Sequence, residues 1–329
     1  MENLQQLFKD FSSIKVGIIG DVMLDTYIWG HVDRISPEAP VPIVSLKNKE
    51  QRIGGAGNVA LNIQSLGAEA FVISVTGKDE EANKLNQLLT EKKINSSYCI
   101  QSNERITTNK TRVISRNQHM MRLDAEMTSD LCLDDQEKLM QEFERFVEKE
   151  KPDVVILEDY NKGVLTEAII HSVISICKQK NIVTAVDPKR KNFFEYKGAD
   201  IFKPNLKEVK DALNLLFADI DLSLLQSIHS ELHHLLHHQI SLVTLSEKGV
   251  FYQQGNRSAI VPSHIRSIAD VSGAGDTVIA VAALVYSATK NVHLMAEIAN
   301  IAGGLVCEEV GTVAINKHKL LQECELLLS

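Results

Sequence analysis

Two carboxylates bracket a glycine-rich stretch that leads into an apolar run of helical length. This stretch is Asp270-Val-Ser-Gly-Ala-Gly-Asp276, and residues 277–288 follow it. Backbone with small side chains at a helix N-terminus leaves N–H groups free to bind an anion, and the helix dipole favours negative charge there. A carboxylate in such a place would then be available to take a proton from a nucleophile that attacks a bound phosphate. The alternative is an ordinary helix with a capping aspartate, and this stretch alone does not separate the two.

A second glycine turn, Gly54-Gly-Ala-Gly-Asn58, opens another predicted helix, which ends at Gly67. Asn58 falls in its first turn, where its side chain can hydrogen-bond a ligand. The spacing also fits a relaxed dinucleotide-binding fingerprint, with Asp79 downstream. That fingerprint needs a buried strand running into its first glycine, whereas the polar segment 47–52 precedes Gly54. A nicotinamide-dependent enzyme is therefore the weaker interpretation.

The elements around these turns predict an α/β fold with a central, mainly parallel sheet flanked by helices. Short apolar runs predict strands at 15–20, 71–75, 153–157, 182–186, 200–205 and 241–245. Helical segments at 79–93, 134–150 and 166–180 alternate with them, a hairpin covers 249–261, and helices at 292–308 and 316–328 follow. Such alternation implies right-handed crossovers. The strands end in polar residues, which is where such sheets bind ligands.

Two segments, approximately 26–50 and 96–124, interrupt the alternation. They are rich in extended-chain and turn residues, and we expect them to form a small β-sheet lid on a single domain that spans residues 1–329. The second segment carries Lys110, Arg112 and Arg116 at even spacing, which would place three cations on one strand face. Such a face suits an anionic substrate group, although a solvated charged face is an equal alternative.

Composition narrows the class of protein. The chain has 329 residues, of which 44% are hydrophobic and 24% charged, as in globular proteins with a large core. A net charge of −8 argues against broad nucleic-acid binding. The absence of a signal-peptide pattern, of a long apolar run and of Cys-x-x-Cys pairs predicts a cytoplasmic protein with reduced thiols and no membrane partner. The histidines within 233–238 have metal-binding spacing, but a solvated helical face is the favoured interpretation.

The two glycine motifs resemble the paired signatures of the PfkB (ribokinase-like) sugar kinases. Residues 54–60, Gly67 and Gly77 match the first signature, and residues 270–276 match the second. The signatures occur in the family's order, some two hundred residues apart; Val281 is a minor departure. The resemblance implies that Asp276 deprotonates the anomeric hydroxyl of a sugar. It also implies that the transferring phosphoryl group is bound by backbone N–H groups of Gly273, Ala274 and Gly275.

The resemblance further implies binding sites for sugar, ATP and ions. It places sugar hydroxyls at Asp25, Gly54, Gly55 and Asn58. It assigns Mg²⁺ and the ATP phosphates, through water, to Asn205 and Glu208. It assigns the nucleotide to Ser246, Glu247, Gly249 and Asn300, with Lys189 reaching a phosphate. Asp270 is expected to support its loop or a monovalent cation such as K⁺.

Within the family, the chain more specifically resembles the D-glycero-β-D-manno-heptose-7-phosphate kinases. The stretches that carry this likeness are 20–25, 34–42, 115–118, 122–124 and 275–279. They imply ATP-dependent phosphorylation of the 1-hydroxyl. The even spacing of Lys110, Arg112 and Arg116, and not the resemblance, makes these three cations candidates for binding the distal phosphate. A kinase of another sugar or nucleoside, or a non-catalytic binding protein, remains an alternative. We also expect a homodimer formed through the lid and, because no H-x-G-H motif precedes Ser329, a stand-alone kinase.

Overall fold

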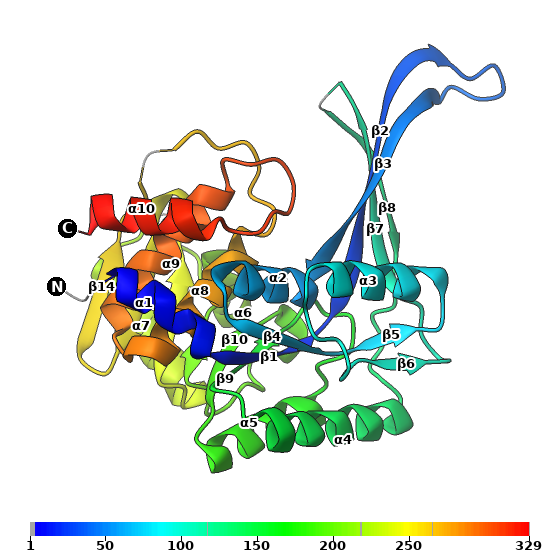
Figure 1. Cartoon of the computed structure of the whole chain (residues 1–329). Coiled ribbons are helices and arrows are strands. Elements are labelled where there is room, and N and C mark those ends of the chain that lie inside the picture. The colour runs from blue at the N-terminus through cyan, green and yellow to red at the C-terminus, as the bar shows by residue number, and fades with distance from the viewer. Residues whose placement is uncertain (1–3, 117, 218, 265, 329) are drawn as a thin grey trace.

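The computed structural model describes residues 4–116, 118–217, 219–264 and 266–328. Its central sheet has eight strands in the order β14-β13-β12-β11-β10-β9-β1-β4 (Figure 1). The strands are β1 (Lys15–Gly20), β4 (Glu69–Ile73), β9 (Val154–Glu158), β10 (Val183–Asp187), β11 (Ile201–Phe202), β12 (Ile240–Thr244), β13 (Val250–Gln254) and β14 (Arg257–Val261). Only β13 and β14 are antiparallel to their neighbours in this sheet. The predicted mainly parallel α/β fold is therefore confirmed.

Helices cover both faces of the sheet and create two hydrophobic cores. One face is covered by α1 (Leu4–Asp10), α2 (Ala56–Leu66), α3 (Glu80–Glu91), α8 (Ala274–Thr289), α9 (Val292–Val306) and α10 (Lys317–Leu327). The other is covered by α4 (Leu133–Glu150), α5 (Glu167–Lys180), α6 (Leu206–Leu213) and α7 (Leu222–Leu236). Successive strand residues serve opposite cores, as with Ile18 and Ile19 of β1. Continuous apolar runs follow from burial on both faces.

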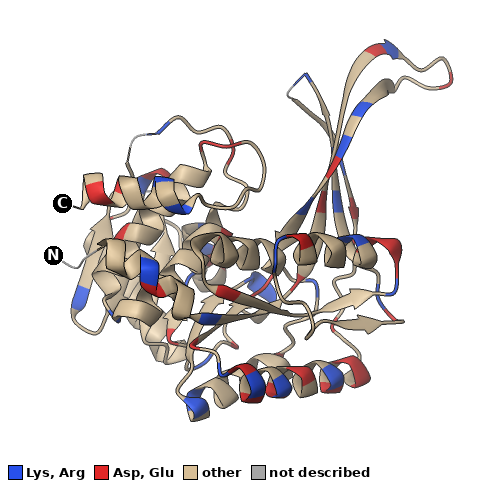
Figure 2. Ribbon diagram, in the orientation of Figure 1, with Lys and Arg blue, Asp and Glu red and all other residues tan. Residues whose placement is uncertain are grey.

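Helix α8 lies inside the molecule, packed against α2 and α9. Every residue from Asp276 to Tyr286 is buried, so the helix is apolar around its whole circumference. Residues of both signs are instead interspersed along α4 and the lid strands (Figure 2). The buried position of α8 fixes its N-terminus, and with it Asp276, relative to the ends of the sheet strands.

The lid is a four-stranded sheet in the order β3-β2-β7-β8 that projects from the body (Figure 1). It consists of β2 (Val22–Ile35), β3 (Pro42–Gly55), β7 (Thr108–Ser115) and β8 (Gln118–Ala125). The expected lid segments, 26–50 and 96–124, differ at their ends from the observed strands of this sheet. The sheet already includes residues 22–25 because β2 follows β1 almost directly, and it excludes 96–107. Within that excluded part, β6 (Ile100–Ser102) pairs with β5 (Val75–Gly77) instead.

Two other expectations need correction. The strand predicted at 200–205 shortens to Ile201–Phe202, because Pro204 lacks an N–H and Asn205 already caps α6. The histidine segment is not a uniformly solvated helical face: α7 ends at Leu236, and the His238 side chain is buried beside Phe202. In the described ranges, no helix combines the length and apolar character needed to cross a bilayer.

Candidate active site

Asp276 lies in the first turn of α8 and is 4% exposed. Its Oδ2 accepts a hydrogen bond from Nδ2 of Asn58 at 2.7 Å, and its Oδ1 accepts one from the Tyr160 hydroxyl at 2.6 Å. Burial raises the pKa of Asp276; the bonds from Tyr160 and Asn58 lower it, but the net shift is upward. A buried carboxylate with a raised pKa and fixed orientation has the properties of a general base.

The two predicted glycine turns meet at this carboxylate, because Asn58 lies in the first turn of α2. Gly55 precedes that helix with a φ of 59°, and a Cβ there would lie 2.3 Å from the Asp21 carbonyl oxygen. Gly273 caps α8 with a φ of 77°. Both positions demand glycine because side chains rarely adopt this backbone region. The glycines therefore allow two helix N-termini to approach one another.

Three buried carboxylates converge here: Glu158 at the end of β9, Asp187 at the end of β10, and Asp276. One oxygen from each lies within 4.8 Å of the others. Neither Glu158 oxygen has a hydrogen-bond partner among the described residues. Its pKa is raised well above the usual range, first by burial and then by the charges of Asp187 and Asp276. Lys203, 2% exposed, balances part of this charge by pairing with Asp187 at 2.8 Å.

The residues predicted for Mg²⁺ adjoin this acidic centre. Asn205 and Glu208 form a capping box at the start of α6, with reciprocal bonds of 2.8 Å. The ammonium of Lys189 lies between two carboxylates. It is 3.1 Å from Asp187 and 2.8 Å from Oε1 of Glu208, the oxygen that takes no part in the capping box. An internal cation held by two carboxylates shows that this position favours positive charge. Carboxylate and amide oxygens also suit a hard cation, so the donor set fits Mg²⁺.

The residues predicted for the nucleotide are brought near one another. Ser246 and Glu247 lie in a 3₁₀ turn that ends at Gly249, whose φ is 96°. The Ser263 hydroxyl donates to the Glu247 carbonyl, and Asn300 in α9 donates to the Pro262 carbonyl at 2.8 Å. These two hydrogen bonds bring both segment 246–249 and Asn300 next to segment 262–263.

Asp270 organises two loops and does not contact Asp276. Its Oδ1 accepts bonds from the backbone and hydroxyl of Ser272, and its Oδ2 accepts one from the Gly311 N–H at 2.9 Å. Burial raises the pKa of Asp270, but these bonds produce a net lowering. The different surroundings of Asp270 and Asp276 separate a loop-supporting carboxylate from the candidate base.

The predicted sugar residue Asp25 lies on β2 beside Gly54, and it is buried and paired with Arg112 of β7. Lys110 pairs with Asp124 at 3.2 Å and Glu126 at 2.7 Å. The expected single face of three cations is not formed, because β7 ends at Ser115 and Arg116 lies in the following turn with a φ of 48°. The two cations that remain on β7 are each held by carboxylates.

Residue type and spacing predicted no role for four residues of this site: Tyr160, Glu158, Asp187 and Lys203. Each of them ends or follows a buried strand, so the sequence marked them only as polar residues at strand ends. That signal marks many polar residues equally. Their convergence depends on β9 and β10 lying side by side beneath α8.

Known proteins show similarity over nearly the whole chain. Residues 13–319 match the pfkB family carbohydrate kinases. The bifunctional protein HldE of Aliarcobacter butzleri is 39% identical over 305 residues, which are 93% of this chain and 63% of that protein. HldE of Helicobacter hepaticus is 36% identical over 310 residues, 94% of this chain and 64% of that protein. The chain thus spans less than two thirds of the length of these relatives.

Solved structures share the fold at low sequence identity. Phosphofructokinase-2 from Escherichia coli in complex with potassium has a TM-score of 0.78 at 18% identity, covering 96% of this chain and 99% of that one. Ribokinase from Arabidopsis thaliana, complexed with ribose and ATP, has a TM-score of 0.72 at 18% identity, covering 94% and 99%. From the family match over most of its length, this chain belongs to the pfkB family of carbohydrate kinases.

Proposed function

We propose that the chain transfers the γ-phosphoryl group of ATP to the anomeric 1-hydroxyl of D-glycero-β-D-manno-heptose 7-phosphate, giving the 1,7-bisphosphate. In this role it would serve ADP-heptose synthesis for lipopolysaccharide core precursors. The observation that carries the proposal is the buried Asp276 carboxylate at the N-terminus of α8, oriented by Asn58 and Tyr160. The similarity to HldE proteins supports the choice of sugar.

Asp276 is proposed to accept the proton of the 1-hydroxyl as that oxygen attacks the γ-phosphorus. A new O–P bond forms, the bond between the γ-phosphorus and the β,γ-bridging oxygen breaks, and ADP departs with the bonding electrons. Positioned proton transfer contributes about 10²–10⁴-fold to such a rate. Backbone N–H groups of Gly273, Ala274 and Gly275 would bind the transferring phosphoryl oxygens, a role worth about 3–4 kcal/mol per donor.

Asn205 and Glu208, with Asp187, are the residues that would hold Mg²⁺, partly through water. Bound Mg²⁺ supplies charge screening for the clustered ATP phosphates. Lys189 now pairs with Asp187 and Glu208, and we propose that it turns toward a nucleotide phosphate when ATP binds. Segments 246–249 and 262–263, with Asn300, would bind the nucleoside. Asp270 is proposed to support the loop beside a K⁺ site.

We also propose a homodimer formed through the lid. Strand β8 is exposed along its whole length, including the apolar side chains of Met121 and Leu123, which are 56% and 54% exposed. Apolar side chains on an exposed edge strand favour pairing with another chain. A second copy, with the same exposed strand, is the partner that this surface fits.

A substrate panel tests the proposed reaction. Purified protein with Mg·ATP would be offered ribose, fructose 6-phosphate, adenosine and the heptose 7-phosphate, with product identified by phosphorus NMR. We expect turnover of the heptose phosphate at the highest kcat/KM. Preference for one of the other three would overturn the assigned substrate. Asp276→Asn should abolish turnover of the preferred substrate and leave ATP binding nearly intact; equal turnover would remove the base assignment.

A further inference from the structure

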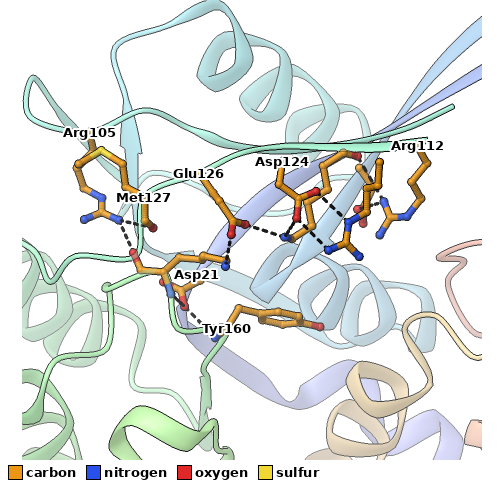
Figure 3. Close-up of polar contacts among 11 residues, drawn as sticks. Asp21, Arg105, Arg112, Asp124, Glu126, Met127 and Tyr160 are labelled. Carbon is orange, nitrogen blue, oxygen red and sulfur yellow. Dashed lines mark hydrogen bonds and ion pairs between the residues drawn. The ribbon is translucent and has the colours of Figure 1, made fainter. Parts of the chain in front are cut away.

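One carboxylate lies between two lysines that come from different parts of the molecule. Glu126 accepts hydrogen bonds from Nζ of Lys110 at 2.7 Å and from Nζ of Lys162 at 2.8 Å. Lys110 belongs to lid strand β7, whereas Lys162 belongs to the loop after β9. Figure 3 shows the Glu126 side chain between the lid and the loop that carries Tyr160. Two ammonium groups therefore point at one anion position.

The second lysine is rigidly placed by its backbone. Asp21 accepts the N–H groups of Tyr160, Lys162 and Val164 at 2.8, 3.0 and 3.1 Å. Arg105, labelled in Figure 3, also donates a hydrogen bond to the backbone carbonyl of Lys162. The side chains of Lys110 and Lys162 are each 14% exposed, so both charges are partly removed from water. Partial burial strengthens their attraction for an anion.

The lysine pair adjoins both parts of the proposed sugar site. Lys110 is the cross-strand partner of Asp25, the residue proposed to bind sugar hydroxyls. Lys162 lies two residues after Tyr160, which donates to the candidate base Asp276. An anionic group bound between the lysines would therefore belong to a molecule that also reaches Asp25 and Asp276. A sugar phosphate, with its phosphate at the end remote from the reacting hydroxyl, has this form.

We propose that Lys110 and Lys162 together bind the distal phosphate of the substrate, and that Glu126 occupies this anion position in the ligand-free protein. The inference rests on the proposed function and names the residues that select a phosphorylated sugar. A phosphate offers three oxygens and more negative charge than a carboxylate, so it can replace Glu126 between two ammonium groups. Glu126 follows the last residue of β8 and can turn away without breaking a strand.

The proposed exchange predicts that the protein discriminates between phosphorylated and neutral sugars. With a neutral sugar bound, both lysines would stay hydrogen-bonded to Glu126, and the lysine pair would add nothing to the binding affinity. A phosphorylated sugar would exchange one anion for another and keep both ammonium groups satisfied. Arg112 has a different part, because it pairs with Asp25 and stacks over the Tyr27 ring at 5.3 Å.

Direct binding tests the lysine pair without requiring turnover. Calorimetry would compare D-glycero-D-manno-heptose 7-phosphate with the same heptose lacking phosphate, for wild type, Lys110→Gln, Lys162→Gln and Lys162→Arg. Each glutamine variant should weaken binding of the phosphorylated sugar by about 10–100-fold, the value of a hydrogen bond to a charged group. Binding of the neutral sugar should not change. Lys162→Arg should retain most of the affinity, and Lys138→Gln, which removes an exposed lysine of α4 paired with Asp134, is the matched control.

The outcomes separate this inference from the proposed function. If wild type binds both sugars equally, the proposal of a phosphorylated substrate is wrong, and so is the proposed anion site. If wild type prefers the phosphate and both glutamine variants keep that preference, the lysine pair alone is wrong. Glu126→Gln tests the exchange: we expect tighter binding of the heptose phosphate because a competing carboxylate is gone. Tenfold weaker binding would show that Glu126 is a scaffold for the lysines and would overturn the exchange.

Discussion

The hydroxyl of Tyr160 donates a hydrogen bond to Oδ1 of Asp276 at 2.6 Å, joining the loop after β9 to the first turn of α8. Asn58 occupies the other carboxylate oxygen. The candidate base is thus held at both oxygens by donors that stabilise its charged form. Tyr160 is a positioning residue in the proposed reaction, because it would act only through its hydrogen bond to Asp276.

Tyr160→Phe is expected to lower kcat by about 10-fold, since one hydrogen bond to a charged group is lost. The KM for ATP should stay near the wild-type value. Because the lost donor had lowered the pKa of Asp276, that pKa should rise, and the acidic limb of the kcat/KM profile should move to higher pH. Steady-state kinetics across pH would measure both effects.

Tyr252→Phe is the matched control for this variant, since Tyr252 of strand β13 hydrogen-bonds His293 of helix α9 and not Asp276. It should leave kcat and the pH profile unchanged. A Tyr160→Phe enzyme with lower kcat but an unmoved acidic limb would indicate a general loss of structure, contrary to the expected effect on the base.

Glu158→Gln is expected to stabilise the protein at neutral and alkaline pH. The pKa of Glu158 is raised above its usual 4.5 by burial, so the unfolded chain releases this proton at lower pH than the folded one. Stability from this group is therefore present below about pH 4.5 and decreases as pH rises. Glutamine is neutral throughout and removes that decrease.

Thermal unfolding from about pH 5 to pH 8 would show the Glu158→Gln effect as a Tm advantage that grows with pH. Glu137→Gln, on the exposed surface of α4, should show no such growth. A variant curve parallel to that of wild type would mean that the Glu158 carboxyl titrates alike in both states.

The buried histidine cluster should make folding sensitive to acid. Ser241 Oγ lies 2.8 Å from Nδ1 of His229 and 2.6 Å from Nε2 of His238. Burial lowers the pKa of His229 from 6.5 to about 4 and that of His238 from 6.5 to about 3. Because protonation is easier in the unfolded chain, stability is fully present above about pH 6.5 and falls as pH drops toward these values.

His238→Phe should weaken this acid sensitivity, as measured by urea unfolding at about pH 7.5 and pH 5. The exposed His234→Gln variant should keep the wild-type difference between the two conditions. If His238→Phe keeps that difference as well, protonation of His238 does not contribute to acid unfolding.

Negative charges introduced on the lid should dissociate the proposed dimer. Met121→Asp with Leu123→Asp places two carboxylates on exposed β8 and would oppose pairing with a second copy. Sedimentation velocity should show a dimer for wild type and a monomer for the double variant. A wild-type monomer at micromolar concentration would overturn the proposal; Lys138→Gln on α4 is the control surface change.

The alternation of apolar strands and helices, and the two glycine turns, were readable from sequence because each depends on short-range features. A strand buried on both faces needs an apolar run, and a helix N-terminus that approaches another backbone needs glycine. The lid boundaries do not depend on local features alone, since residues 100–102 have strand character but pair with β5. Even spacing of Lys110, Arg112 and Arg116 was misleading because the strand stops at Ser115.

The sequence by itself determined the α/β class, the two glycine turns and Asp276 as the candidate base. The tertiary structure alone decided which other groups surround that base. Tyr160 reaches Asp276 across 116 positions. Glu126 joins Lys110 to Lys162 because the end of β8 lies beside both β7 and the loop after β9. Strand order and the placement of the lid create these contacts, and neither can be predicted from the spacing of residues along the chain.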